Sequence, residues 1–198
     1  FVYSGEETHG DVFIFFSQIS GVYAPGVKLV TDKQLDWLSK QFETYKDKRV
    51  YLFFHTFFNA PSGKGAMGEG NLINDYGLSY SLPYFKGNKD EKRFRSLLEE
   101  YKNVTFFNGH SHFTYAMESY NPRLNITDYD GTTATMVHVS SVTAPRTTGI
   151  LQPKLTSNPG KMSEGLYITV YPTYIIVTAC DFFGGRFLAY ANYRIDMK

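Results

Sequence analysis

The stretch TDKQLDWLSKQFETYKDKRVYLFFH, residues 31–55, contains a helix signal followed directly by a strand signal. Thr31 and Gln34 match a capping box, in which the threonine hydroxyl accepts from the backbone N–H of Gln34 and the glutamine side chain reaches back. Apolar residues then recur at spacings of three and four, as on one face of an amphipathic helix: Leu35, Leu38, Phe42 and Tyr45. This pattern predicts a helix over residues 32–47.

Short continuous apolar runs on both sides of this helix are typical of buried strands. DVFIFFS, residues 11–17, precedes the helix, and RVYLFF, residues 49–54, follows it and ends at His55. A second amphipathic segment predicts a helix over residues 90–101, and VTFFN, residues 104–108, predicts a third buried strand after it. The order strand, helix, strand, helix, strand is that of crossover units with parallel strands.

Beyond residue 113 the pattern changes to short alternating segments separated by turn signals, which are typical of antiparallel strands. We predict strands over residues 113–119, 134–140, 166–171, 174–181 and 186–195. Taken with the crossover units before them, these strands predict a layered α/β fold with a mixed sheet.

Composition excludes several classes of protein. The chain has 198 residues with 20 Lys and Arg against 19 Asp and Glu, a net charge of +1. Binding to nucleic acid through bulk charge needs an excess of clustered Lys and Arg, so it is excluded. One cysteine allows no internal disulfide. No apolar run approaches the roughly 18 residues of a membrane span, and no signal peptide is evident.

Three histidines lie where two of the predicted parallel strands end. His55 follows the strand over 49–54, and His110 and His112 follow the strand over 104–108. Ligands gather at the carboxyl ends of parallel strands, so these histidines should face one crevice. Two imidazoles at a spacing of two residues can bind one metal or one each of a metal pair. The alternative is that all three are ordinary structural histidines, the role we also expect for His138 in its alternating strand.

A long loop is predicted over residues 56–88, which are rich in Gly, Pro, Asn and Ser. Loops of this length in compact domains are usually functional. Gly63, Gly65 and Gly68 match a GxGxxG pattern, but the pattern neither follows a strand directly nor opens a helix, as a dinucleotide site requires. We therefore expect a flexible loop beside the crevice, and whether it serves as a lid over the crevice is left undecided.

Several segments together resemble the calcineurin-like metallophosphoesterases. They are the stretches QLDWLSKQFETYKDKRVYLFFH and FRSLLEEYKNVTFFNGHSH, with the strand GDVFIFFSQ before them and the segments SSVTAPR and SEGLYITVYPTYIIVTACDF after them. That family carries a strand ending in a metal-binding histidine, and a later strand ending in Gly-His-x-His. The resemblance implies a layered αββα sandwich with a mixed sheet, and a phosphoesterase that hydrolyses a phosphate mono- or diester.

The resemblance also implies roles for the three histidines. His55 and His110 resemble ligands of the family's second metal, and His112 resembles a ligand of its first metal. Two divalent ions (Mn, Fe, Zn or similar) would hold the phosphate, and an activated hydroxide would attack phosphorus in line.

Three motifs of that family are absent from these 198 residues: Asp-x-His, Gly-Asp-x-x-Asp and Gly-Asn-His-Glu/Asp. Gly10-Asp11 continues Val-Phe-Ile, so it does not match the second of them. Three imidazoles without a carboxylate make a poor dinuclear centre for hard cations. We therefore expect residues 1–198 to be the C-terminal part of a single metallophosphoesterase domain whose N-terminal half is missing. Alone it should bind metal weakly, hydrolyse little and cover its bare apolar face, for example by forming a homodimer.

Two other hypotheses stay open. The missing carboxylates also suit a non-catalytic binding module that kept a metallophosphoesterase fold without a complete metal site. A weaker alternative is an interaction half that pairs with a separate N-terminal chain. The substrate, the identity of the metal and the cellular location cannot be read from these residues.

Overall fold

The computed structural model describes residues 1–19, 30–55, 89–109, 112, 114–115, 126–127, 134–143, 145–149, 152–157 and 162–196. Its helices are the single 3-10 turn η1 (Glu6–Thr8) and the α-helices α1 (Asp32–Thr44) and α3 (Lys89–Glu100). Its strands are β1 (Val2–Ser4), β2 (Val12–Phe15), β3 (Val50–Phe54), β4 (Val104–Asn108), β5 (Ile126–Thr127), β6 (Thr135–His138), β7 (Arg146–Gly149), β8 (Gln152–Ser157), β9 (Glu164–Val170), β10 (Tyr174–Asp181) and β11 (Arg186–Asp196).

The main sheet has the strand order β1-β2-β3-β4-β6-β5. Its four central strands are mutually parallel, and β1 and β5 join the two sides antiparallel. A second sheet, β11-β10-β9, is antiparallel throughout, and β7 pairs with β8. The predicted mixed α/β architecture is therefore confirmed over the described residues.

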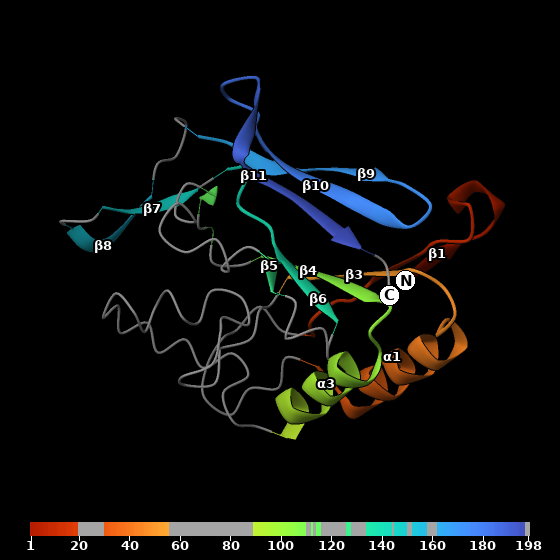
Figure 1. Cartoon of the computed structure of the whole chain (residues 1–198). Coiled ribbons are helices and arrows are strands. Elements are labelled where there is room, and N and C mark those ends of the chain that lie inside the picture. Colours follow the sequence, from red (N-terminus) through yellow and green to blue (C-terminus); the bar gives the residue numbers. More distant parts are fainter. Residues whose placement is uncertain are drawn as a thin grey trace.

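Helices α1 and α3 cover one face of the main sheet, and the second sheet covers the other (Figure 1). On the helical side, Leu35, Leu38 and Phe42 of α1 are fully buried, and so are Phe94 and Leu98 of α3. These side chains pack in one cluster with Val12, Ile14, Val50, Leu52, Val104 and Phe106 of the sheet. Burying this much apolar surface is the main stabilising contribution to the layer.

On the opposite face, alternate residues of the same strands point toward the second sheet. Tyr51 and Phe107 pack in one cluster with Ile175, Val177 and Ile195. Because β3 and β4 are apolar on both faces, they read as continuous hydrophobic runs in the sequence. The described part of the chain thus forms three layers, which are helices, mixed sheet and antiparallel sheet.

The predicted capping box at the start of α1 is present. The Gln34 N–H donates to Thr31 Oγ1 at 3.1 Å, and the Thr31 N–H donates to Gln34 Oε1 at 2.8 Å. Gln34 Nε2 also donates to the carbonyl of Ser17 at 2.8 Å, which ties the helix to the segment after β2. The helix ends at Thr44 rather than at residue 47, because the three residues that follow form a turn leading to β3.

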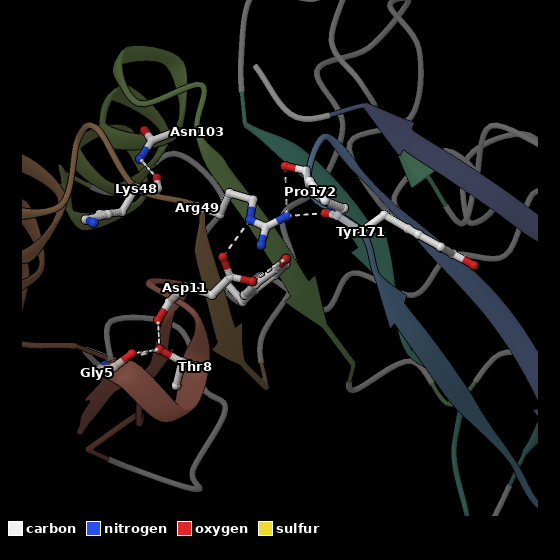
Figure 2. A network of polar contacts seen from close by, with 9 residues as sticks. Gly5, Thr8, Asp11, Lys48, Arg49, Asn103, Tyr171 and Pro172 are labelled. Atoms are coloured by element: carbon white, nitrogen blue, oxygen red, sulfur yellow. Dashed lines mark hydrogen bonds and ion pairs between the residues drawn. The ribbon is translucent and has the colours of Figure 1, made fainter.

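A polar network joins the two sheets at the amino ends of β2 and β3 (Figure 2). Arg49 Nε donates to Asp11 Oδ1 at 2.5 Å, and the same guanidinium donates to the carbonyls of Tyr171 and Pro172 in the turn between β9 and β10. The Tyr51 hydroxyl donates to Asp11 Oδ2 at 3.3 Å. Burial, and after it the negative charge of Asp11, raises the pKa of Tyr51 well above its usual range.

Of the other predictions from the sequence, some are confirmed, one is wrong and one falls outside the described residues. The strands predicted over 134–140, 166–171, 174–181 and 186–195 are present as β6, β9, β10 and β11. The strand predicted over 113–119 is wrong at Thr114 and Tyr115, which are not in a strand. Residue 113 and residues 116–119 lie outside the described residues. The loop over 56–88, with its three glycines, also lies outside the described residues. Among described helices, none is long and apolar enough to cross a membrane.

Candidate functional site

The carboxyl ends of β3, β4 and β6 lie side by side, as expected for parallel strands. Phe54 is opposite Asn108 in the register, and Asn108 is opposite His138. His55 therefore follows one strand at the level where Gly109 follows the next. His55 is exposed, whereas Asn108 and His138 are each 2 % exposed. The edge thus combines an accessible imidazole with buried polar groups beneath it.

Gly109, which follows β4, is in direct contact with His55, which follows β3. Its N–H donates to the carbonyl of His55 at 3.2 Å, and the Val139 N–H donates to the carbonyl of Asn108 at 2.7 Å. A Cβ added at Gly109 would stand 3.9 Å from His55 Nδ1. The beginning of the Gly-His-x-His segment therefore lies against the imidazole of His55, which is 54 positions earlier in the chain.

His112 is partly buried and has a left-handed backbone, with φ of 63°. This conformation is uncommon for a residue other than glycine, although histidine is among the types that adopt it more often. His110, the remaining predicted ligand, lies outside the described residues. Within the described ranges, no three His, Cys, Asp or Glu side chains are grouped closely enough to hold a metal. The metal roles of His55, His110 and His112 therefore stay predictions.

Below the edge lies a buried polar group that sequence reasoning did not single out. Glu164, the first residue of β9, is 2 % exposed, and its Oε2 accepts from the N–H of Tyr115 at 2.9 Å. The ring of Tyr115 lies 5.7 Å from that of His138. Burial raises the pKa of Glu164, and the hydrogen bond from the Tyr115 amide opposes that rise. The acidic group is thus held inside the protein by a hydrogen bond to the segment that leaves β4.

Asn108 was also missed, because it was counted only as the end of an apolar strand. Its Oδ1 and the Oγ1 of Thr114 are buried and have no hydrogen-bond partner among the described residues. Such buried atoms are rare in folded proteins and call for an explanation, such as a water or an ion. The available signal in the sequence was the polar residue immediately before Gly109.

A cavity formed by described residues lies elsewhere. It has a volume of about 930 Å³ and lies at the amino ends of β2 and β3, where its lining includes His9, Asp11, Lys48, Arg49 and Tyr171. Of the predicted metal ligands that the structure describes, neither His55 nor His112 lines it, and Asp11 and Arg49 are paired with each other. We take the carboxyl edge as the candidate site, because parallel sheets bind ligands there and His55 lies there beside Gly109.

Comparison with known proteins gives a partial similarity to solved structures. No family profile and no curated protein matches the chain. Among solved structures, the chain is similar to a dimetal phosphatase from Danio rerio, with a TM-score of 0.45 and 12 % sequence identity. The match covers 87 % of this chain and 41 % of the phosphatase chain. The chain therefore spans about two fifths of the length of that solved protein.

Proposed function

We propose that this chain supplies histidine ligands to the metal centre of a phosphoesterase that hydrolyses a phosphate mono- or diester. The observation that carries the proposal is the contact of Gly109 with His55, through the 3.2 Å hydrogen bond and the 3.9 Å approach to Nδ1. Two histidine-bearing segments that are far apart in the sequence are thereby brought to one edge of the sheet. An accessible imidazole beside a short His-x-His segment suits borderline divalent metals such as Zn, Fe and Mn.

The residues at this edge fit a metal site in part. The imidazoles of His55, His110 and His112 would hold the ions, and the Oδ1 of Asn108, which has no hydrogen-bond partner among the described residues, is a neutral acceptor at the same edge. The carboxylates that bridge and charge-balance a two-metal centre would come from motifs that these 198 residues do not contain. We therefore propose that residues 1–198 are the C-terminal part of a metallophosphoesterase domain.

A bound metal would supply Lewis acidity toward the phosphoryl oxygens and would activate water at neutral pH. The chain's own contribution is to orient the histidines. Gly109 leaves space between His55 and the carbonyl of Val139, since a Cβ there would stand 3.6 Å from that oxygen. A side chain larger than alanine would fill the space beside the imidazole.

The test is metal binding by the 198-residue chain, with Co²⁺ and Zn²⁺ as probes. His112→Asn removes an imidazole while keeping a residue type that tolerates a left-handed backbone. His9→Asn is the matched control, because His9 is also left-handed, with φ of 52°, but lies at the amino edge of the sheet. We expect His112→Asn, His55→Ala and His110→Ala each to weaken binding at least tenfold, and His9→Asn to change it less than twofold.

Equal binding by His112→Asn and His9→Asn would refute the metal site. Hydrolysis is tested on the complete product of the gene, with an aryl phosphodiester and Mn²⁺. We expect His110→Ala to abolish turnover there. Metal binding without any turnover by the complete protein would instead support a non-catalytic binding module with this fold.

A further inference from the structure

The buried carboxylate of Glu164 links the second sheet to the segment that carries the histidines. Its Oε2 accepts from the Tyr115 N–H at 2.9 Å, and its own N–H donates to the carbonyl of Ser141 at 3.0 Å. A carboxylate at 2 % exposure is costly to bury unless its hydrogen bonds are satisfied. The bond from the Tyr115 N–H partly offsets that cost.

Tyr115 extends the same link to the strand next to β4. Its side chain is 1 % exposed and packs against Ala179, Leu188 and Ala191. Its hydroxyl accepts from the N–H of Ser140 at 3.0 Å. Through Glu164 and Tyr115, the segments that leave β4 and β6 and the first residue of β9 are therefore fixed to one another.

We call the hydrogen bond from the Tyr115 N–H to Glu164 the clamp. His112 is three positions before Tyr115 in the sequence. Thr114, between them, is 1 % exposed, and His112 itself holds a left-handed backbone, with φ of 63°, a conformation that persists where the surroundings enforce it. Three residues span at most about 10 Å, so the position of Tyr115 limits where His112 can stand.

We propose that Glu164 is a positioning residue for His112: by holding the Tyr115 N–H, it limits where His112 stands relative to His55. The inference rests on the proposed metal function. Glu164 acts here through Tyr115 and does not itself contact the metal. Groups that orient metal ligands from behind typically change metal affinity 10- to 100-fold when removed.

Co²⁺ binding by the 198-residue chain tests this role, with competition against a chromophoric chelator for affinity and visible absorption for ligand geometry. Glu164→Ala removes the acceptor, whereas Glu164→Gln keeps an oxygen that can accept from Tyr115. Asp11→Asn is the matched control, since Asp11 is 5 % exposed and lies at the opposite edge. We expect roughly tenfold or greater loss of affinity and an altered cobalt spectrum in Glu164→Ala, rescue to within about threefold in Glu164→Gln, and no change in Asp11→Asn.

In Glu164→Ala, loss of the clamp alone should speed hydrogen exchange at the Tyr115 amide while the strand amides stay protected. Loss of the fold would speed exchange at both, so hydrogen exchange distinguishes the two cases. A folded Glu164→Ala chain with wild-type cobalt affinity and spectrum would overturn the positioning role while leaving the metal site standing. If Glu164→Gln is as weak as Glu164→Ala, the hydrogen bond is not the cause and the proposal is also wrong. Absence of Co²⁺ binding by the wild-type chain would instead refute the proposed function itself.

Discussion

At the amino edge of the main sheet, Asp11 and Arg49 are paired within the chain, whereas at the carboxyl edge some buried polar atoms have no hydrogen-bond partner among the described residues. Asp11 is bound by Arg49 and Tyr51 at the first edge. At the other, Asn108 Oδ1 and Thr114 Oγ1 have no hydrogen-bond partner among described residues. Natural proteins depart from full internal pairing mainly at functional sites. The contrast is therefore between a paired amino edge and a carboxyl edge whose described buried polar atoms are not all paired.

The largest expected effect comes from breaking the amino edge. Arg49→Met leaves the Asp11 carboxylate, whose side chain is 7 % exposed, without its cation. Removing one partner of a largely buried pair costs about 3–5 kcal/mol, which chemical denaturation would measure. Arg194→Met is the control, because its pair with Asp196 is exposed on both sides and should cost less than about 1 kcal/mol. Equal losses in the two variants would remove the basis for calling the amino edge structural.

Two asparagines, one just before β4 and one at its end, give the most direct comparison of the edges. Asn103, just before the strand, donates to the carbonyls of Tyr45 and Lys48 at 3.1 and 2.7 Å. Losing two hydrogen bonds in Asn103→Leu should cost about 2 kcal/mol of unfolding free energy. Asn108→Leu, at the end of the strand, removes a buried acceptor that has no described partner and should cost nothing or stabilise slightly. A loss in Asn108→Leu as large as that in Asn103→Leu would contradict the contrast.

Alkaline pH should act mainly on the amino edge. The pKa of Tyr51 is raised in the folded chain, chiefly by burial, so its contribution to stability is complete below the unfolded pKa of about 10 and is lost as the pH rises above it. The loss has a slope of up to about 1.4 kcal/mol per pH unit. Urea unfolding from pH 8 to 11 should show a shallower slope for Tyr51→Phe. Tyr190→Phe, at a side chain 51 % exposed, should keep the wild-type slope, and a shallower one there would argue against a special role for Tyr51.

The smallest expected effect concerns the capping box of α1, whose first turn is tied to the segment after β2. Thr31→Ala removes the acceptor for the Gln34 N–H and should cost about 1 kcal/mol. Thr44→Ala removes a threonine in the last turn that only donates to the carbonyl of Lys40, and it should cost a few tenths of that amount. Thermal unfolding would measure both. A larger loss for Thr44→Ala would mean that the cap contributes little.

Local features could be predicted from the sequence because they depend on neighbours in the chain. The capping box, the apolar faces of α1 and α3 and the runs that became β2, β3 and β4 all follow from spacings of a few residues. Strand β1, with three residues, and β5, with two, were not predicted, since pairing along the side of a sheet leaves little periodic signal. The strand expected over 113–119 is absent at Thr114 and Tyr115, its described residues, where Tyr115 is buried by partners distant in the chain.

The same division holds for the candidate site. The positions of His55, His110 and His112 after apolar runs were enough to predict one shared edge, because the carboxyl ends of parallel strands meet. Asn108 and Glu164 could not be predicted, because their importance depends on burial and on partners up to 49 positions away.

By itself, therefore, the sequence determined the helices and the central strands, which follow from short-range periodicity, and it predicted one shared edge for His55, His110 and His112. Only the tertiary structure decided that Gly109 lies against His55, that Arg49 ties the second sheet to the amino edge, and that Glu164 holds the Tyr115 amide. These are contacts between residues far apart in the chain, and their energies depend on burial that no local pattern records.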